Sequence, residues 1–203
     1  MIFMIKVILM DLGGVYFTEG KKIAIERISK KFSVNPEKLR KSLSKDISRE
    51  WRKGKINEKY FVKILARKLN VEEKKAKEMI RIWHDSYTPR NGMNRIVKKL
   101  RKNYKVVVLS GNTKERIRYI DNKYNFQKEF DKCLYSFTFG INKPESRIFK
   151  ASIKKMKVKP KECVMIDDSD KFLRNVKKAG GLAIRFRNPK QLQSDLRSIG
   201  VIV

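Results

Sequence analysis

The chain has 203 residues, enough for one α/β domain with a modest insertion and too few for two large independent domains. Its 51 Lys and Arg residues against 21 Asp and Glu residues give a formal net charge of +30, and such a surface attracts polyanions such as nucleic acids and anionic membranes. The basic excess is spread along the chain, and no Gly-Arg repeat, basic tail or RNP-like aromatic run concentrates it. A dedicated nucleic-acid partner is therefore not favoured.

The N-terminal apolar run does not predict a signal peptide or a membrane anchor. Lys6 interrupts the run, Asp11 ends it, and no small-residue cleavage site follows. We therefore expect a soluble, cytoplasmic protein with no membrane partner. Cys133 and Cys163 each lie in an apolar run, which is typical of buried free thiols, and two cysteines predict neither a disulfide framework nor a structural zinc site.

The first predicted strand covers residues 6–10, where the side chains are mostly apolar and partly β-branched. It ends on Asp11, and two glycines follow at positions 13 and 14, where the missing Cβ atoms let the backbone turn sharply and approach a ligand closely. Ligands bind at the carboxyl ends of strands in open parallel sheets. Asp11 is thus placed for chemistry, because a carboxylate can attack phosphorus to form an acyl phosphate. The alternative is an Asp that only begins a turn.

Residues 19–88 predict helices only. Asn35 and Pro36 mark the start of a helix over residues 36–44, and Asn57 is a predicted N-cap. A later helix carries one apolar stripe, formed by Ala76, Met79, Ile80, Trp83 and Tyr87. We expect an insertion of four or five helices, packed over the end of the first strand and with the stripes forming its own core.

Strand and helix alternate from residue 89 onward. The predicted strands cover residues 105–109, 133–135, 161–166 and 182–186. Helices are expected between them, through Ile96 and Leu100, over residues 113–124, around Phe149, and around Leu173. This alternation predicts an α/β fold, a Rossmann-like parallel sheet with helices on both faces. The core would then be residues 1–18 and 89–203, with the helical insertion at 19–88.

Three of the predicted strands end in polar residues, and a Lys-Pro pair, Lys143 and Pro144, precedes a helix. The polar residues are Asp11, Ser110, Gly111, Asn112, Asp167 and Asp168. Strand ends of this kind meet at one edge of a sheet. Carboxylates brought together there repel one another unless a hard cation lies between them, and Mg²⁺ prefers oxygen ligands. We therefore predict a magnesium site, with Lys143 and Ser110 binding a phosphate.

Each of these features also has a simpler interpretation. The Asp pair can cap a helix, Lys143 can be one more solvated lysine, and residues 110–112 can form a turn. Four such features in this order, each after a strand or before a helix, favour a shared site instead.

The order Asp-x-x-Gly-Val, strand-Ser, Lys-Pro and Asp-Asp resembles the four motifs of the haloacid dehalogenase-like hydrolase (HAD) superfamily. The resemblance covers essentially the whole chain, and the insertion after the first motif is similar to a C1-type cap. More narrowly, residues 11–15, 106–110 and 143–149 are similar to the branch that includes the bacterial α-D-glucose-1-phosphate phosphatases.

The resemblance implies a Mg²⁺-dependent phosphatase that hydrolyses a small phosphorylated metabolite, such as a sugar phosphate, as a monomer or homodimer. Asp11 would be the nucleophile that forms an aspartyl phosphate, and Lys143 would spread charge from the phosphoryl oxygens. The implied metal ligands are the Asp11 carboxylate, the Gly13 carbonyl and one or both of Asp167 and Asp168. The implied phosphate-binding residues are Ser110, Gly111, Asn112 and Lys143.

Three departures from the family pattern leave alternatives open. Gly13 stands where most phosphatases of the superfamily carry a second Asp as general acid and base. Gly111 separates Ser110 from Asn112, and Phe172 stands where an Asn is common. The alternatives are a phosphatase acting on nucleic-acid ends, a catalytically impaired fold that serves as a basic nucleic-acid-binding module, and a haloacid dehalogenase. The intact Asp pair speaks against a dehalogenase, which needs no metal.

Four further residues carry expectations about the insertion and its entrance. We expect a surface or half-buried structural role for His84, the only histidine, rather than the role of a catalytic acid. We expect Tyr16, Phe17 and Glu19 to line the pocket entrance.

Overall fold

The centre of the molecule is a parallel five-stranded sheet of order β3-β2-β1-β4-β5. The computed structural model describes residues 4–44 and 46–203, so residues 1–3 of the predicted core lie outside the described residues. The strands are β1 (Val7–Met10), β2 (Lys105–Ser110), β3 (Lys132–Tyr135), β4 (Cys163–Asp167) and β5 (Leu182–Arg185). The chain builds outward from β1 in both directions, which confirms the predicted Rossmann-like α/β fold and makes the carboxyl end of β1 the expected ligand site.

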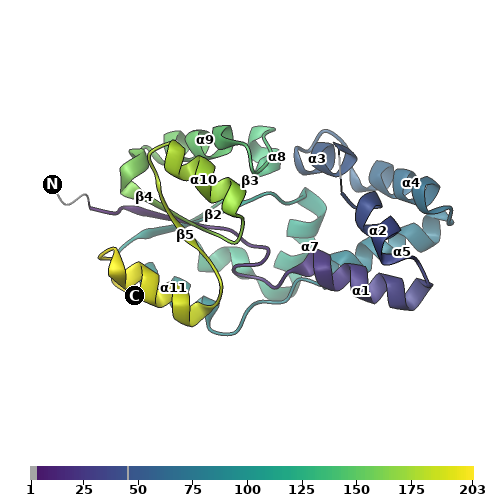
Figure 1. The fold of residues 1–203 in the computed structure, drawn as a ribbon, viewed down its shortest axis with the longest axis horizontal. Coiled ribbons are helices and arrows are strands. Elements are labelled where there is room, and N and C mark those ends of the chain that lie inside the picture. Colours follow the sequence, from purple (N-terminus) through teal and green to yellow (C-terminus); the bar gives the residue numbers. More distant parts are fainter. Residues whose placement is uncertain (1–3, 45) are drawn as a thin grey trace.

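Helices cover both faces of the sheet (Figure 1). Alternate residues of a strand point to opposite faces, so Val7 and Leu9 of β1 pack in one apolar cluster while Ile8 and Met10 pack in the other. The first cluster includes residues of α9 (Ser146–Met156) and α10 (Asp170–Lys178). The second includes residues of α6 (Met93–Leu100), α7 (Lys114–Tyr124) and α11 (Pro189–Ser198). The short elements are α8 (Ser136–Phe139), η1 (Phe126–Glu129) and η2 (Pro160–Glu162).

The helical unit, as we call α1–α5, lies at one end of the molecule, beyond the sheet (Figure 1). Its helices are α1 (Gly20–Phe32), α2 (Pro36–Ser42), α3 (Asp46–Arg52), α4 (Glu58–Leu69) and α5 (Glu73–Asp85). Trp51, Phe61 and Trp83 pack together in its interior, with the rings of Trp51 and Phe61 stacked at 4.4 Å. None of the helices among the described residues is long and apolar enough to span a membrane.

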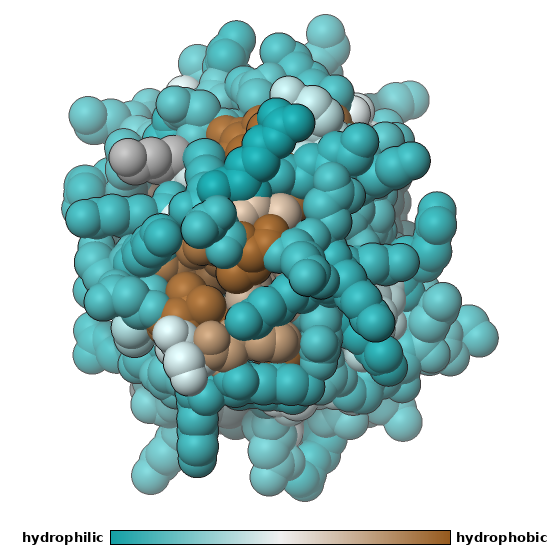
Figure 2. All heavy atoms as spheres, turned by 90° about the vertical axis from the view of Figure 1, so that its right-hand side faces the viewer, coloured by the Kyte–Doolittle hydropathy of each residue, from teal (hydrophilic) through white to brown (hydrophobic). Residues whose placement is uncertain are grey.

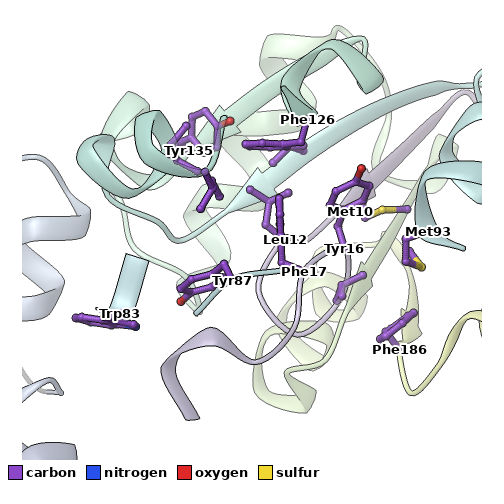
Figure 3. Close-up of a cluster of buried hydrophobic side chains, with 14 of the residues drawn as sticks. Met10, Leu12, Tyr16, Phe17, Trp83, Tyr87, Met93, Phe126, Tyr135 and Phe186 are labelled. Atoms are coloured by element: carbon purple, nitrogen blue, oxygen red, sulfur yellow. The ribbon is translucent and has the colours of Figure 1, made fainter. Parts of the chain in front are cut away.

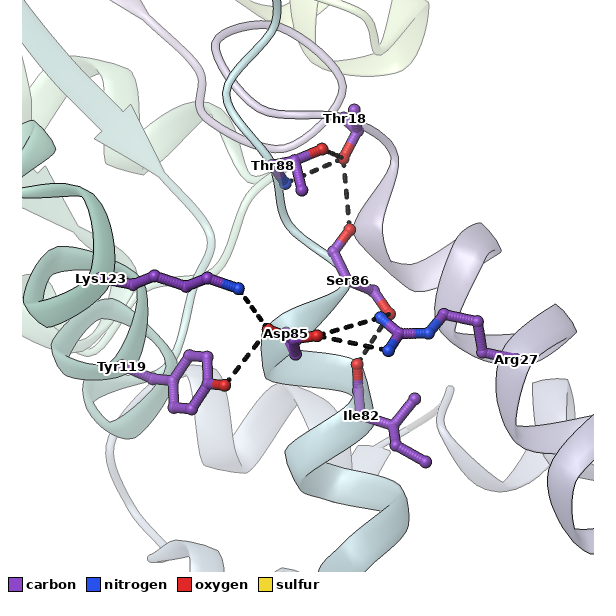
Figure 4. A network of polar contacts seen from close by, with 8 residues as sticks. All are labelled: Thr18, Arg27, Ile82, Asp85, Ser86, Thr88, Tyr119 and Lys123. Atoms are coloured by element: carbon purple, nitrogen blue, oxygen red, sulfur yellow. Dashed lines mark hydrogen bonds and ion pairs between the residues drawn. The ribbon is translucent and has the colours of Figure 1, made fainter.

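The two segments that join the helical unit to the sheet run side by side. The backbone N–H of Thr18 donates to the carbonyl of Thr88 at 2.9 Å, and the Thr88 N–H donates back to the Thr18 hydroxyl at 3.1 Å (Figure 4). Close by, Asp85 at the end of α5 accepts hydrogen bonds from Arg27 of α1 and Lys123 of α7. The helical unit is therefore connected to the rest of the protein through the two hydrogen-bonded connecting segments and through contacts with α7.

Tyr16 and Phe17 do not lie where we expected them. The backbone N–H of Phe17 donates to the carbonyl of Leu12 at 2.7 Å, so the chain after β1 turns back beneath the sheet. Both aromatic side chains are fully buried in the core, where the Phe17 and Phe126 rings meet edge to face at 5.2 Å (Figure 3). The prediction that they line the pocket entrance is wrong for these two residues, because the tight turn points them inward.

Candidate active site

Parallel strands place the predicted polar residues at one edge of the sheet. Met10 pairs in register with Val108 of β2 and with Ile166 of β4, so Asp11 lies beside the last residues of both neighbouring strands. The Asp11 backbone N–H donates to the carbonyl of Ile166 at 3.0 Å and continues the β1 ladder by one step. Ser110 and Asp167 end β2 and β4 and are both buried.

Lys143 lies between the two buried carboxylates. Its Nζ is 2.7 Å from Asp11 Oδ1 and 2.6 Å from Asp167 Oδ2, and it also donates to the carbonyl of Leu109 at 3.1 Å. Burial by itself would lower the pKa of this lysine, but the two carboxylates more than offset it and raise the pKa. Asn175 of α10 donates to the Pro144 carbonyl at 2.8 Å and so fixes the loop that presents Lys143.

The three carboxylates of the site hold more negative charge than one lysine can balance. Oxygens of Asp11, Asp167 and Asp168 lie within 4.8 Å of one another. Burial raises the pKa of Asp11 to about 7, with Asp167 adding to the rise and Lys143 opposing it. Burial also raises the pKa of Asp168 to about 6, again with a contribution from Asp167. A hard divalent cation with oxygen ligands fits this donor set, so the cluster could hold a metal ion such as Mg²⁺.

Gly14 makes room for Asp168. Its φ of +86° belongs to the left-handed region, and a Cβ atom there would clash with the Asp168 carboxylate. The neighbouring Gly13 faces the ring of Tyr87, whose Cε1 would lie 3.3 Å from an added Cβ. A side chain is therefore excluded at the two positions for different reasons. At Gly14 it would meet the Asp168 carboxylate, and at Gly13 it would crowd the Tyr87 ring.

Every predicted site residue lines one cavity of about 260 Å³ at this edge of the sheet. They are Asp11, Gly13, Ser110, Gly111, Asn112, Lys143, Asp167 and Asp168. Sequence reasoning missed Arg52, Tyr87 and Ser169 as lining residues. Arg52 carries no local motif, and Tyr87 was assigned only to the apolar stripe of its helix. Phe172 also lines the cavity, with its ring centroid 4.9 Å from Lys143 Nζ.

A buried arginine orients Asn112. The Arg116 guanidinium donates to Asn112 Oδ1 at 3.1 Å, so the amide oxygen points to Arg116 and the amide NH₂ remains as a donor. Arg116 lies 3.9 Å from the centroid of Trp83 and also donates from Nε to His84 Nδ1 at 3.2 Å. Its buried Nη2 atom has no hydrogen-bond partner among the described residues. Arg116 is thus the link between the site and the helical unit.

His84 is buried within this link. Its Nδ1 accepts from Arg116, and its Nε2 lies 2.7 Å from Glu58 Oε2, which places the proton of a neutral ring on Nε2. Burial lowers the pKa of His84, and Arg116 adds to the effect against the opposing influence of Glu58. These contacts hold the His84 ring in place between Arg116 and Glu58. They agree with the structural role that we expected, but the expected surface or half-buried position is wrong, because α5 and α7 enclose the ring.

The chain belongs to the haloacid dehalogenase-like hydrolase family, whose model matches residues 5–174. An uncharacterized protein of Dictyostelium discoideum is 32% identical over 149 residues, which cover 71% of this chain and 64% of that protein. The chain therefore spans less than two thirds of the length of this curated relative.

Solved structures of the same family share the fold. A HAD family enzyme of Bacteroides thetaiotaomicron, in complex with magnesium and inorganic phosphate, has a TM-score of 0.78 at 23% identity, over 93% of this chain and 98% of that chain. An L-2-haloacid dehalogenase of Xanthobacter autotrophicus, with chloropropionic acid covalently bound, has a TM-score of 0.69 at 16% identity, over 98% of this chain and 85% of that chain. At these identities the likeness shows the fold alone, and the chemistry has to be argued from the site.

Proposed function

We propose that the protein is a Mg²⁺-dependent phosphatase that hydrolyses a small phosphorylated metabolite through an aspartyl-phosphate intermediate. The observation that supports this most directly is Lys143, held between Asp11 and Asp167 in a cavity that Asp168 and residues 110–112 also line. The magnesium and phosphate bound to the Bacteroides enzyme are consistent with such a site.

In the proposed reaction, a carboxylate oxygen of Asp11 attacks phosphorus, and the ester oxygen leaves with the bonding electron pair. Lys143 and the hydroxyl of Ser110 stabilise charge on the equatorial phosphoryl oxygens, and the amide NH₂ of Asn112 is free to donate to them. Mg²⁺, held by Asp11, Asp167, Asp168 and the Gly13 carbonyl, would supply further charge stabilisation when bound. Water then attacks the phosphoryl group, which releases phosphate and restores the Asp11 carboxylate.

The absence of a second Asp at position 13 limits the choice of substrate. Proton donation to the leaving group has no carboxylic acid at this position, so a substrate with a weakly basic leaving oxygen is favoured. The anomeric oxygen of a sugar phosphate is one such leaving group. This reasoning supports the α-D-glucose-1-phosphate phosphatase branch as the subfamily that we propose.

We assign the helical unit the role of a C1-type cap over the site, with boundaries at residues 19 and 88. Arg52 of α3 and Tyr87, which follows the end of α5, reach the cavity wall from within these boundaries, and the paired threonines 18 and 88 mark the crossing into the helical unit. A cap in this position would exclude water from the acyl phosphate and contribute to substrate selection.

A dehalogenase is the competing function, since one such enzyme shares the fold. The carboxylate cluster of Asp11, Asp167 and Asp168 favours the phosphatase, because a metal-free dehalogenase has no use for three mutually repelling carboxylates.

The test is phosphate release from sugar phosphates, nucleotides, phosphorylated oligonucleotides and p-nitrophenyl phosphate, each with Mg²⁺ or EDTA. We expect release that needs Mg²⁺ and is abolished in Asp11→Asn, whose amide is not a competent nucleophile. Chloride release from a haloacid, unaffected by EDTA, would contradict the phosphatase and favour the dehalogenase.

A further inference from the structure

A second cavity of about 400 Å³ adjoins the first. Gly13, Tyr87 and Asp168 line both cavities, so the two are separated by little more than the Tyr87 ring and the turn after β1. The remaining wall of the second cavity comes from the helical unit and includes Lys21 and Arg40. A substrate whose phosphoryl group lies at Asp11 can therefore extend in this direction.

Lys21 of α1 lies near several arginine side chains and has no acidic partner among the described residues. Its Nζ is within 2.5 Å of the Ser44 hydroxyl oxygen, and among the described residues it forms no ion pair with a carboxylate. The pKa of Lys21 is lowered to about 8, mainly by burial and in part by the nearby guanidinium groups of Arg52, Arg40 and Arg116. Like charges near one another repel, and a partly buried cation without an acidic partner keeps the cost of its desolvation.

Arg52 continues this cationic surface into the first cavity. Its guanidinium donates only within α3, to the Ser48 carbonyl at 3.3 Å and the Ser48 hydroxyl at 3.2 Å. No carboxylate of the described chain pairs with it in an ion pair. Arg40 has one ion pair, with Glu37 at 3.5 Å, and both side chains of that pair are more than half exposed.

Acids do not balance these cations within the second cavity. The acidic residues on its wall are Glu19 and Asp168, and Asp168 already belongs to the carboxylate cluster of the first cavity. An anionic group bound between Lys21 and Arg40 would relieve the repulsion and replace the missing partners.

We propose that Lys21, Arg40 and Ser44 form a subsite for a second anionic group, a phosphate or a carboxylate, on a small phosphate-ester substrate. This proposal rests on the proposed phosphatase function and narrows its substrate class. Arg52 lines the first cavity, where the reacting phosphoryl group would lie, and its charge also acts on Lys21. A phosphate on a long neutral or purely hydrophobic group would leave the subsite unused.

The test compares matched substrates that differ by one anionic group. The pairs keep the anomeric leaving oxygen: glucose 1,6-bisphosphate against glucose 1-phosphate, which adds a phosphate, and glucuronic acid 1-phosphate against glucose 1-phosphate, which adds a carboxylate. Lys21→Gln is assayed beside Lys30→Gln, an exposed lysine of the same helix whose loss changes the charge equally. We expect Lys21→Gln to raise KM about 10-fold or more for the member of a pair that carries the second anionic group, with kcat nearly unchanged, because one charge-assisted contact is lost.

For the substrates without a second anionic group, Lys21→Gln should change KM by less than about 2-fold. Lys30→Gln should change KM by less than about 2-fold for every substrate, as is usual for surface substitutions. The pair with the larger difference identifies the anion as phosphate or carboxylate. Equal effects of Lys21→Gln on both members of each pair would overturn the subsite while the phosphatase function stands. If the wild type releases phosphate from no ester, calorimetric titration with glucose 1,6-bisphosphate and with glucuronic acid 1-phosphate decides separately: unweakened binding of both in Lys21→Gln, or no binding of either to the wild type, overturns the subsite.

Discussion

Individual residues show how closely the chemistry and the backbone of this site depend on each other. Gly14 and Gly92 have nearly the same φ, +86° and +84°, but an added Cβ would strike the Asp168 carboxylate at Gly14 and would meet nothing within 4 Å at Gly92. Substituting Gly92 therefore tests backbone strain alone, whereas substituting Gly14 adds a steric clash with the carboxylate cluster.

We predict that Gly14→Ala and Gly92→Ala both lose about 1 kcal/mol of unfolding free energy, since each places a Cβ in the left-handed region. Gly14→Ala should lose more, and it alone should weaken Mg²⁺ binding by about 10-fold or more, because Asp168 must move. Urea unfolding measures the first effect, and calorimetric titration with Mg²⁺ measures the second. Wild-type Mg²⁺ affinity in Gly14→Ala would show that Asp168 is not a metal ligand.

The sequence was most informative at residues whose chemistry matches their position in a strand-loop-helix unit. Asp11, Ser110, Lys143 and Asp167 could be predicted because each follows a buried strand or precedes a helix, and parallel strands bring such positions together. Tyr87 could not be predicted as a wall of the cavity. Its place opposite Gly13 depends on the packing of the helical unit on the sheet, which no local pattern encodes.

At the scale of helices and strands, the prediction succeeded where apolar periodicity was strong and failed in short or terminal elements. The strand predicted at residues 161–166 begins later, at Cys163, because η2 occupies residues 160–162. The helix α11 was not predicted, although Asn188 and Pro189 carry its start signal and Asn188 accepts from the Gln191 N–H at 2.9 Å. Helix α3, which carries Arg52, is too short to show a clear stripe.

The contact between α5 and α7 should make stability depend on pH. His84 of α5 accepts from Arg116 of α7 as a neutral ring, and its pKa is lowered in the folded protein. Below the ordinary histidine pKa of about 6.5, the unfolded chain binds a proton that folded His84 does not. Stability from this residue is therefore fully present above about pH 6.5 and is lost as the pH falls below it.

We predict that the wild type loses about 1 kcal/mol more unfolding free energy than His84→Gln between about pH 7.5 and about pH 5.5. Glutamine offers one acceptor and one donor but does not titrate, so it is the matched variant. The raised pKa values of Asp11 and Asp168 make the folded protein more stable as the pH falls, which opposes the effect of His84. Both proteins contain these carboxylates, so their contribution cancels when the two losses of unfolding free energy are subtracted. Urea unfolding at the two pH values measures this difference, and identical pH slopes would mean that the pKa of His84 is the same in the folded and the unfolded chain.

At the scale of the whole molecule, the large positive charge bears on whether the substrate is a small metabolite or the phosphorylated end of a nucleic acid. The formal net charge of +30, which remains after all 21 acidic residues are counted, is spread over the chain. Figure 2 shows that the face formed by the outer end of the helical unit is mostly hydrophilic, with a small apolar area in its middle. A surface of this kind attracts any polyanion, whereas the anionic subsite that we propose is confined to one wall of a cavity.

These two kinds of attraction differ in their response to salt. An oligonucleotide held by the general surface contacts many lysines and arginines, so we predict that its affinity, followed by fluorescence anisotropy, falls about 10³-fold or more between about 50 mM and about 200 mM salt. The KM for a small phosphate ester with a second anionic group should rise far less, because both groups would lie in cavities where few counterions are displaced. A phosphorylated oligonucleotide that binds at high salt, and loses its terminal phosphate faster than the small esters do, would instead indicate a nucleic-acid end as the substrate. The same charge would then be part of substrate recognition, and the subsite at Lys21 and Arg40 would bind the next phosphate of the strand.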